Sequence, residues 1–106
     1  MNQKDREISS KIKNRIFQKN PEAQVILFGS HARGQATINS DWDILILLNQ
    51  HNVSRNVEGE YRDELFDIEL EIGEPISTFV FSKFDWESKF SVTPLFQNIQ
   101  KDGIYL

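Results

Sequence analysis

The chain has 106 residues, a net charge of −4 and no cysteine. Its length predicts one domain, residues 1–106, with a single modest core. The missing cysteines exclude disulfides, thiol nucleophiles and cysteine-bound metals, and they favour a cytoplasmic location. The acidic charge excludes the broad basic face of proteins that bind extended nucleic acids. No apolar run approaches the roughly 20 residues of a membrane span, so we expect no membrane segment.

A first helix is predicted over residues 3–19. Ile8, Ile12 and Ile16 recur every four residues, with mainly polar side chains between them. This spacing is typical of an amphipathic helix that packs one face on a core. Pro21 ends it, because the residue before a proline is driven out of the helical conformation.

Two apolar runs, Gln24–Phe28 and Ile44–Leu48, are predicted strands. Neither alternates polar and apolar residues, which indicates strands buried on both faces in a sheet covered by helices. The segment between them is polar. Gly29 and Ser30 form a predicted turn into a short helix, and the second strand is entered through two aspartates.

Residues 61–72 fit two patterns. Tyr61, Leu65, Ile68 and Ile72 form a helical stripe, whereas Phe66, Ile68, Leu70 and Ile72 alternate as in a strand. The length of the segment and the position of Gly73 as a left-handed stop favour a helix. The preceding residues, 49–60, have no clear period and are either a loop or the first turn of this helix.

The C-terminal third begins with a third predicted strand, Ile76–Phe81, identified by its β-branched and aromatic residues. Ser82 then caps a short helix, and Thr93-Pro94 opens a last helix to about Lys101. This third is rich in aromatic residues. Core packing is the commoner explanation for them, and an exposed patch for a partner is the alternative.

Asp41 and Asp43 are the first candidates for chemistry. Because they are two residues apart on a strand, they point to the same face, whereas Trp42 points to the other and anchors the strand. Two adjacent carboxylates repel each other unless a cation lies between them. Oxygen-only ligands select a hard ion such as Mg²⁺, and a pair of such ions supports in-line phosphoryl displacement.

The turn at Gly29–Ser30 is the second candidate. A glycine lets the backbone approach an anion closely, Ser30 adds a hydroxyl and Arg33 adds a positive charge. This turn and the carboxylates can act together only at the same end of the sheet. We therefore expect the first two strands to pair antiparallel.

These residues carry a resemblance to a known family. The sequence Gly-Ser-His-Ala-Arg-Gly at 29–34, followed by Ser-Asp-Trp-Asp at 40–43, resembles the signature of the minimal nucleotidyltransferases of the polymerase-beta-like superfamily. The resemblance implies an α+β fold with a small mixed, largely antiparallel sheet flanked by helices. It also implies that Gly29 and Ser30 bind a nucleoside triphosphate, that Asp41 and Asp43 bind Mg²⁺, and that Arg33 and Ser40 are further phosphate contacts.

The implied reaction transfers a nucleoside monophosphate, typically AMP from ATP, to an acceptor hydroxyl. Chains of this size resemble antitoxins that pair with HEPN-domain toxins, so a HEPN-type protein or a second copy is the expected partner. The alternative is a binding protein of the same fold that has lost efficient catalysis and masks a toxin or regulates an enzyme.

One residue departs from the family pattern. The superfamily has a third carboxylate on a later strand, and the best-aligned residue here is Ser77, a weak neutral ligand. Glu69, Glu71 and Glu74 are substitutes by proximity only, and Asp67 joins them if residues 61–72 form a strand. Of the other polar residues, His31 is assigned no role beyond a phosphate contact, whereas His51 and Lys83 are expected on the surface.

Overall fold

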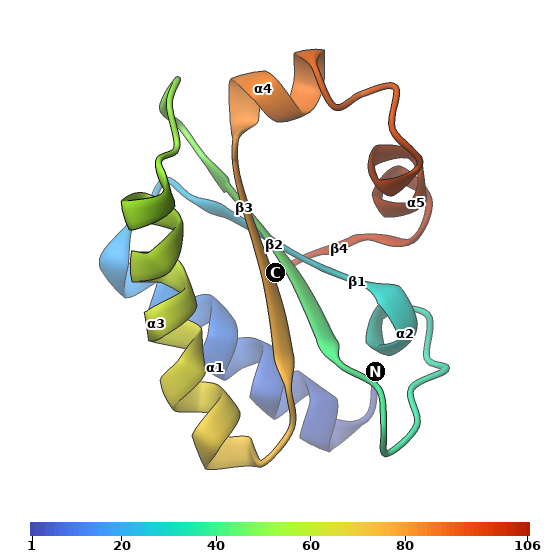
Figure 1. The fold of residues 1–106 in the computed structure, drawn as a ribbon. Helices are drawn as coiled ribbons and strands as arrows, with labels where there is room; N and C mark the ends of the chain where they lie inside the picture. The colour runs from blue at the N-terminus through green and yellow to red at the C-terminus, as the bar shows by residue number, and fades with distance from the viewer.

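The computed structural model describes residues 1–106 as five helices and four strands (Figure 1). In chain order these are α1 (Gln3–Lys19), β1 (Gln24–Phe28), α2 (Gly29–Ala32), β2 (Trp42–Leu48), α3 (Arg55–Ile72), β3 (Ile76–Ser82), α4 (Lys83–Ser88), α5 (Pro94–Asp102) and β4 (Ile104–Tyr105).

The strands form one mixed sheet in the order β3-β2-β1-β4. β1 is antiparallel to both β2 and β4, and β2 is parallel to β3. The predicted fold class and the predicted antiparallel pairing of β1 with β2 are therefore confirmed. The parallel pair follows from the α3 crossover, since parallel neighbours need a long connection. β4 was not predicted, because two residues after a glycine give no periodic pattern.

Helices cover both faces of the sheet (Figure 1). On one face, α1 and α3 bury a core cluster that includes Ile12, Trp42 and Leu65. On the other face, Trp86 of α4 and Ile99 of α5 pack on a second cluster. The apolar runs of β1 and β2 thus lack alternation because both of their faces are buried, as predicted.

The ambiguous segment is helical. α3 begins at Arg55, where the Ser54 side chain accepts a hydrogen bond from the Val57 N–H, and it ends at Gly73, whose φ of 70° is left-handed. This confirms the choice of helix and the role of the glycine. It also places the start of the helix well before Tyr61, because the Ser54 cap and not an apolar stripe fixes the first turn.

The C-terminal helices begin at the predicted caps. The Ser82 side chain accepts from the Asp85 N–H, and the Thr93 side chain accepts from the Phe96 N–H. Trp86 is 3% exposed and stacks with neighbouring phenylalanine rings. Phe79, Phe81, Phe90 and Phe96 are partly buried and pack against the cluster that contains Trp86, which favours core packing. Phe84 and Tyr105 are the exceptions, at 59% and 65% exposed.

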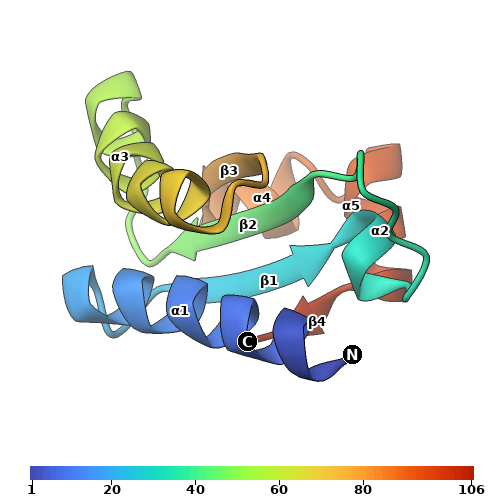
Figure 2. The same ribbon diagram turned by 90° about the horizontal axis from the view of Figure 1, so that it is seen from below.

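Figure 2 shows that β1 leads directly into α2 at the end of the sheet where β2 begins. The 30–41 connection folds over this end and brings the turn beside the entrance of β2. None of the helices is both long and apolar enough to cross a membrane.

Candidate functional site

The two aspartates stand at the entrance of β2, at the centre of the sheet. Asp43 pairs with Phe28 of β1 on one side and with Ser77 of β3 on the other. Trp42 is fully buried on the opposite face, whereas Asp41 is exposed and Asp43 is half-buried. The alternation predicted from the sequence is therefore present, and it leaves both carboxylates available to a ligand.

Gly29 brings the backbone against one of these carboxylates. Its φ is +75°, in the region that glycine tolerates and other residues avoid. A Cβ at this position would lie 3.1 Å from the Asp43 Cγ and closer still to its Oδ2. Only a glycine fits here without moving Asp43, so the turn and the carboxylate form one structural unit.

The Asp43 carboxyl is electrostatically perturbed. Burial raises its pKa above the usual value, and the negative charge of Asp41 raises it further, whereas His31 and Arg33 lower it. The ionised form is therefore destabilised in the folded chain. A bound cation would relieve both the desolvation and the repulsion.

Ser77 occupies the position expected from the family resemblance. It lies opposite Asp43 in the β2–β3 register, and its hydroxyl donates a 3.0 Å hydrogen bond to Asp41 Oδ2. The register thus places Ser77 beside the two aspartates. The third position of the site holds a neutral hydroxyl that already contacts a carboxylate.

The proposed substitute carboxylates have other partners. Glu69 accepts a 2.7 Å hydrogen bond from the Ile76 N–H, and Glu71 pairs with Lys11 at 2.6 Å. Glu74 lies beside Lys4 at 3.2 Å and accepts a bond from the Trp42 indole, on the face away from Asp43. The structure brings none of them to Asp41 and Asp43. Asp67 pairs with Arg15 at 3.2 Å because residues 61–72 are helical.

Arg33 and Ser40 lie at the two ends of the loop between α2 and β2. Arg33 lies 3.9 Å from Asp102 and close enough to Asp43 to lower its pKa. Ser40 Oγ accepts a 2.9 Å hydrogen bond from the Thr37 N–H and so shapes the loop. Lys83 follows the far end of β3, about 20 Å along the strand from Ser77, so it does not reach this site. His51 is exposed, as expected.

His31 packs on Trp42, on the face of the sheet opposite to the two aspartates. Its ring is 5% exposed and stacks on Trp42 with a centroid distance of 3.8 Å, and its Nδ1 lies 3.7 Å from Asp5 Oδ2. Neither ring nitrogen has a hydrogen-bond partner. A phosphate contact would require the ring to leave this stack. The only sign of this contact in the sequence is the strand alternation that points Trp42 to the face opposite the two aspartates.

The donor set fits a magnesium ion bound together with a nucleotide. Mg²⁺ is usually held by one or two carboxylates plus substrate phosphates and water, and not by a cage of protein ligands. Asp41 and Asp43 supply two carboxylates. No group of three histidine, cysteine, aspartate or glutamate side chains is placed to hold a metal ion in this chain.

Comparisons with known proteins identify the fold and the family of the chain. A solved structure of a toxin–antitoxin with AMP-PNP has the same fold, with a TM-score of 0.66 and 22% identity over 91% of this chain and 69% of the other. No curated protein matches at a significant level. The sequence model of the nucleotidyltransferase domain family matches residues 9–104, nearly the whole chain. The chain therefore belongs to the nucleotidyltransferase domain family.

Proposed function

We propose that this domain transfers a nucleoside monophosphate, AMP from ATP, to a hydroxyl group of a partner protein in a Mg²⁺-dependent reaction. The observation that carries the proposal is the contact between Gly29 and Asp43, in which a side chain on the turn would displace the carboxylate. The Gly29–Ser30 turn has room for an anion, and the adjacent Asp43 carboxylate is stabilised by a cation. That combination suits a metal–triphosphate complex.

Each residue has a role in this proposal. Gly29 and Ser30 bind the triphosphate, with Arg33 and Ser40 as outer contacts, and the carboxylates of Asp41 and Asp43 hold Mg²⁺. When bound, the metal ion neutralises charge that develops on the phosphate oxygens. The sheet fixes the spacing of both carboxylates, and the buried Trp42 holds their orientation. Two protein carboxylates suffice for one ion. A second ion would depend more on the nucleotide and water.

The partner is proposed to be a HEPN-type toxin, with this chain as the antitoxin. One solved structure that shares the fold is a toxin–antitoxin with AMP-PNP, an ATP analogue. This supports both ATP as the nucleotide and a protein as the acceptor. A second copy of this chain is the alternative partner.

A second function is favoured by Ser77. Its hydroxyl is a poor base and a weak metal ligand, and no other carboxylate approaches Asp41 and Asp43. A domain with this site can bind Mg²⁺ and nucleotide yet transfer slowly. In that case it acts by binding and masking its partner, as a regulatory subunit or antitoxin.

Incubation with ATP labelled on the α-phosphate separates the two functions. The reaction is run with Mg²⁺, with and without the protein encoded beside this chain. Label that moves to protein and disappears in Asp41→Asn and Asp43→Asn supports the transferase. Tight binding of the partner that survives both substitutions, with no transfer of label, supports masking and overturns the transferase.

A further inference from the structure

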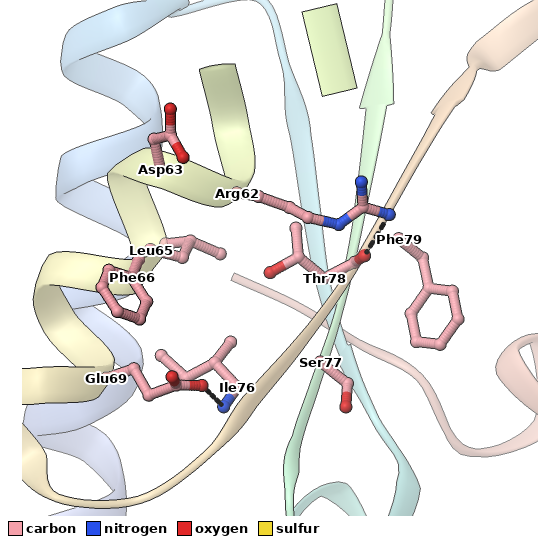
Figure 3. Close-up of a pocket in the computed structure, with 9 residues that line it drawn as sticks. All are labelled: Arg62, Asp63, Leu65, Phe66, Glu69, Ile76, Ser77, Thr78 and Phe79. Atoms are coloured by element: carbon pink, nitrogen blue, oxygen red, sulfur yellow. Dashed lines mark hydrogen bonds between the residues drawn. The ribbon is translucent and has the colours of Figure 1, made fainter. Parts of the chain in front are cut away.

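β3 forms one edge of the sheet, and a pocket lies along that edge. The strand order leaves one side of β3 without a neighbouring strand. The pocket, of about 420 Å³, lies here between β3 and α3 (Figure 3). Ser77, whose hydroxyl donates to Asp41, is among its lining residues. Neither aspartate lines the pocket itself, and α3 covers the opposite face of the sheet, so the pocket is connected to Asp41 through Ser77.

The pocket and the phosphate turn flank these carboxylates from opposite sides. β2 has β1 as one neighbour and β3 as the other. Gly29 approaches Asp43 from the end of β1, whereas Ser77 approaches Asp41 from β3. A molecule bound at the turn would thus meet a side chain that extends from the pocket past Ser77 to Asp41 and Asp43.

This arrangement matches the demands of phosphoryl transfer. In an in-line displacement the attacking and leaving oxygens lie on opposite sides of the phosphorus atom. If the β- and γ-phosphates occupy the Gly29–Ser30 turn, the attacking oxygen arrives from the side of β3. We propose that the pocket between α3 and β3 is the acceptor site, in which a segment of the partner protein presents its hydroxyl group. The inference rests on the proposed transferase function.

The chemistry of the pocket suits a protein segment. Apolar walls come from α3 and β3, and one cation and two carboxylates stand among them. The lining residues are Arg62, Asp63, Leu65, Phe66, Glu69, Ile76, Ser77, Thr78 and Phe79. Phe66 is 52% exposed, and Leu70, one turn further along α3, is 67% exposed. A polynucleotide would need several cations here, whereas a mixed peptide needs an apolar anchor and a few polar contacts.

Main-chain groups of the edge strand also face the pocket. The Ile76 N–H donates to Glu69, and the Thr78 carbonyl accepts from the Arg62 guanidinium at 3.4 Å (Figure 3). The contact made by Arg62 is long and exposed. An extended segment of a partner can replace it with a main-chain N–H, as in strand addition to a sheet edge. Such a contact would fix the register of the segment and bring one side chain beside Ser77.

The transfer step balances without any further reactant. The hydroxyl oxygen of the acceptor forms a bond to the α-phosphorus of the nucleoside triphosphate. The bond from that phosphorus to the oxygen bridging the α- and β-phosphates breaks, and pyrophosphate leaves. The hydroxyl proton passes to a carboxylate oxygen of Asp41 and then to water. Ser77 remains a neutral neighbour of this carboxylate.

The test blocks the pocket without touching the carboxylates. Phe66→Glu adds a charge to the apolar wall at a half-exposed position, so the fold is expected to persist. Phe84→Glu is the matched control, since Phe84 is 59% exposed and lies beyond the far end of β3. With α-labelled ATP, Mg²⁺ and an extract of the source cells as acceptor, the wild type labels a protein. We expect Phe66→Glu to lower this labelling at least tenfold and Phe84→Glu to leave it unchanged.

Binding of Mg²⁺ with the uncleavable α,β-methylene analogue of ATP, measured in parallel, should be equal in all three proteins. Labelling by Phe66→Glu within twofold of the wild type overturns the acceptor site and leaves the transferase standing. Label found on a nucleic acid or on a small molecule overturns the protein segment as occupant. A wild type that binds the analogue but labels nothing overturns the transferase and the acceptor site together.

Discussion

The contact between Gly29 and Asp43 makes the substitution Gly29→Ala informative, because two effects can be separated. The first is backbone strain. An alanine at φ +75° costs about 1–2 kcal/mol, since its Cβ crowds the carbonyl oxygen. For a domain of this size, each kcal/mol lowers the melting temperature by about 4–8 °C. The second effect is the overlap with Asp43, whose carboxylate must rotate away from the new methyl group.

A matched control isolates the second effect. Gly34 has a φ of +70°, but a Cβ there meets nothing within 4 Å. Gly34→Ala therefore carries the same strain without moving a carboxylate, and Gly73→Ala repeats this at the end of α3, where φ is also +70°. Gly34→Ala and Gly73→Ala are expected to lose comparable stability in thermal melts, and Gly29→Ala at least as much.

Binding of Mg²⁺ with the α,β-methylene analogue of ATP, measured by calorimetry, should then separate them. We expect Gly29→Ala to bind at least tenfold more weakly than Gly34→Ala, which corresponds to about 1.4 kcal/mol. Equal binding by the two variants would refute the reasoning, since it would mean that the position of the Asp43 carboxylate does not matter for the ligand.

Three further predictions address the carboxylates and the C-terminal strand. Burial raises the folded-state pKa of Asp43, so its charge destabilises the fold at neutral pH. Without Mg²⁺, the Asp43→Asn variant should therefore melt at a higher temperature than the wild type. The difference in melting temperature should vanish as the pH falls below the usual carboxyl pKa. A variant that melts at a lower temperature than the wild type at neutral pH would contradict this. Ser77→Asp should lower the melting temperature without Mg²⁺ and raise the transfer rate with it, whereas an unchanged rate would argue that a third acid does not limit transfer. Gly103→Ala places a Cβ 2.5 Å from the Ile99 carbonyl oxygen. It should therefore destabilise the domain by roughly 1–3 kcal/mol without changing nucleotide binding. A melting temperature equal to that of the wild type would show that β4 can shift to make room for the methyl group.

The parts of the fold that the sequence predicted are those with strong local signals. The apolar residues of α1 recur every four residues, so only a helix places them on one buried face. The apolar runs of β1 and β2 are buried only as strands covered on both faces. The two aspartates were placed on one face by strand geometry alone, and the opposite burial of Trp42 confirmed it. The antiparallel pairing followed from the chemistry, because the turn and the carboxylates had to lie at the same end.

The parts that it missed depend on contacts between distant residues. β4 is two residues long and exists because it pairs with β1, so no local pattern encodes it. The stack of His31 on Trp42 joins α2 to the far face of β2, which strand alternation alone does not reveal. The partners of Glu69 and Glu71 were likewise invisible, since they depend on how α3 packs against β3 and α1. Proximity in sequence placed these acids near the site, whereas the helix directs them away from it.

The central claim is that Asp41, Asp43 and the Gly29–Ser30 turn together hold a metal–nucleotide complex. Calorimetric titration with the α,β-methylene analogue of ATP tests it directly, in Mg²⁺ and in EDTA, for the wild type and for Asp43→Asn. We predict binding by the wild type that needs Mg²⁺ and falls at least tenfold in Asp43→Asn, although the variant is folded. Binding that is equal in EDTA, or equal in the variant, would contradict the claim.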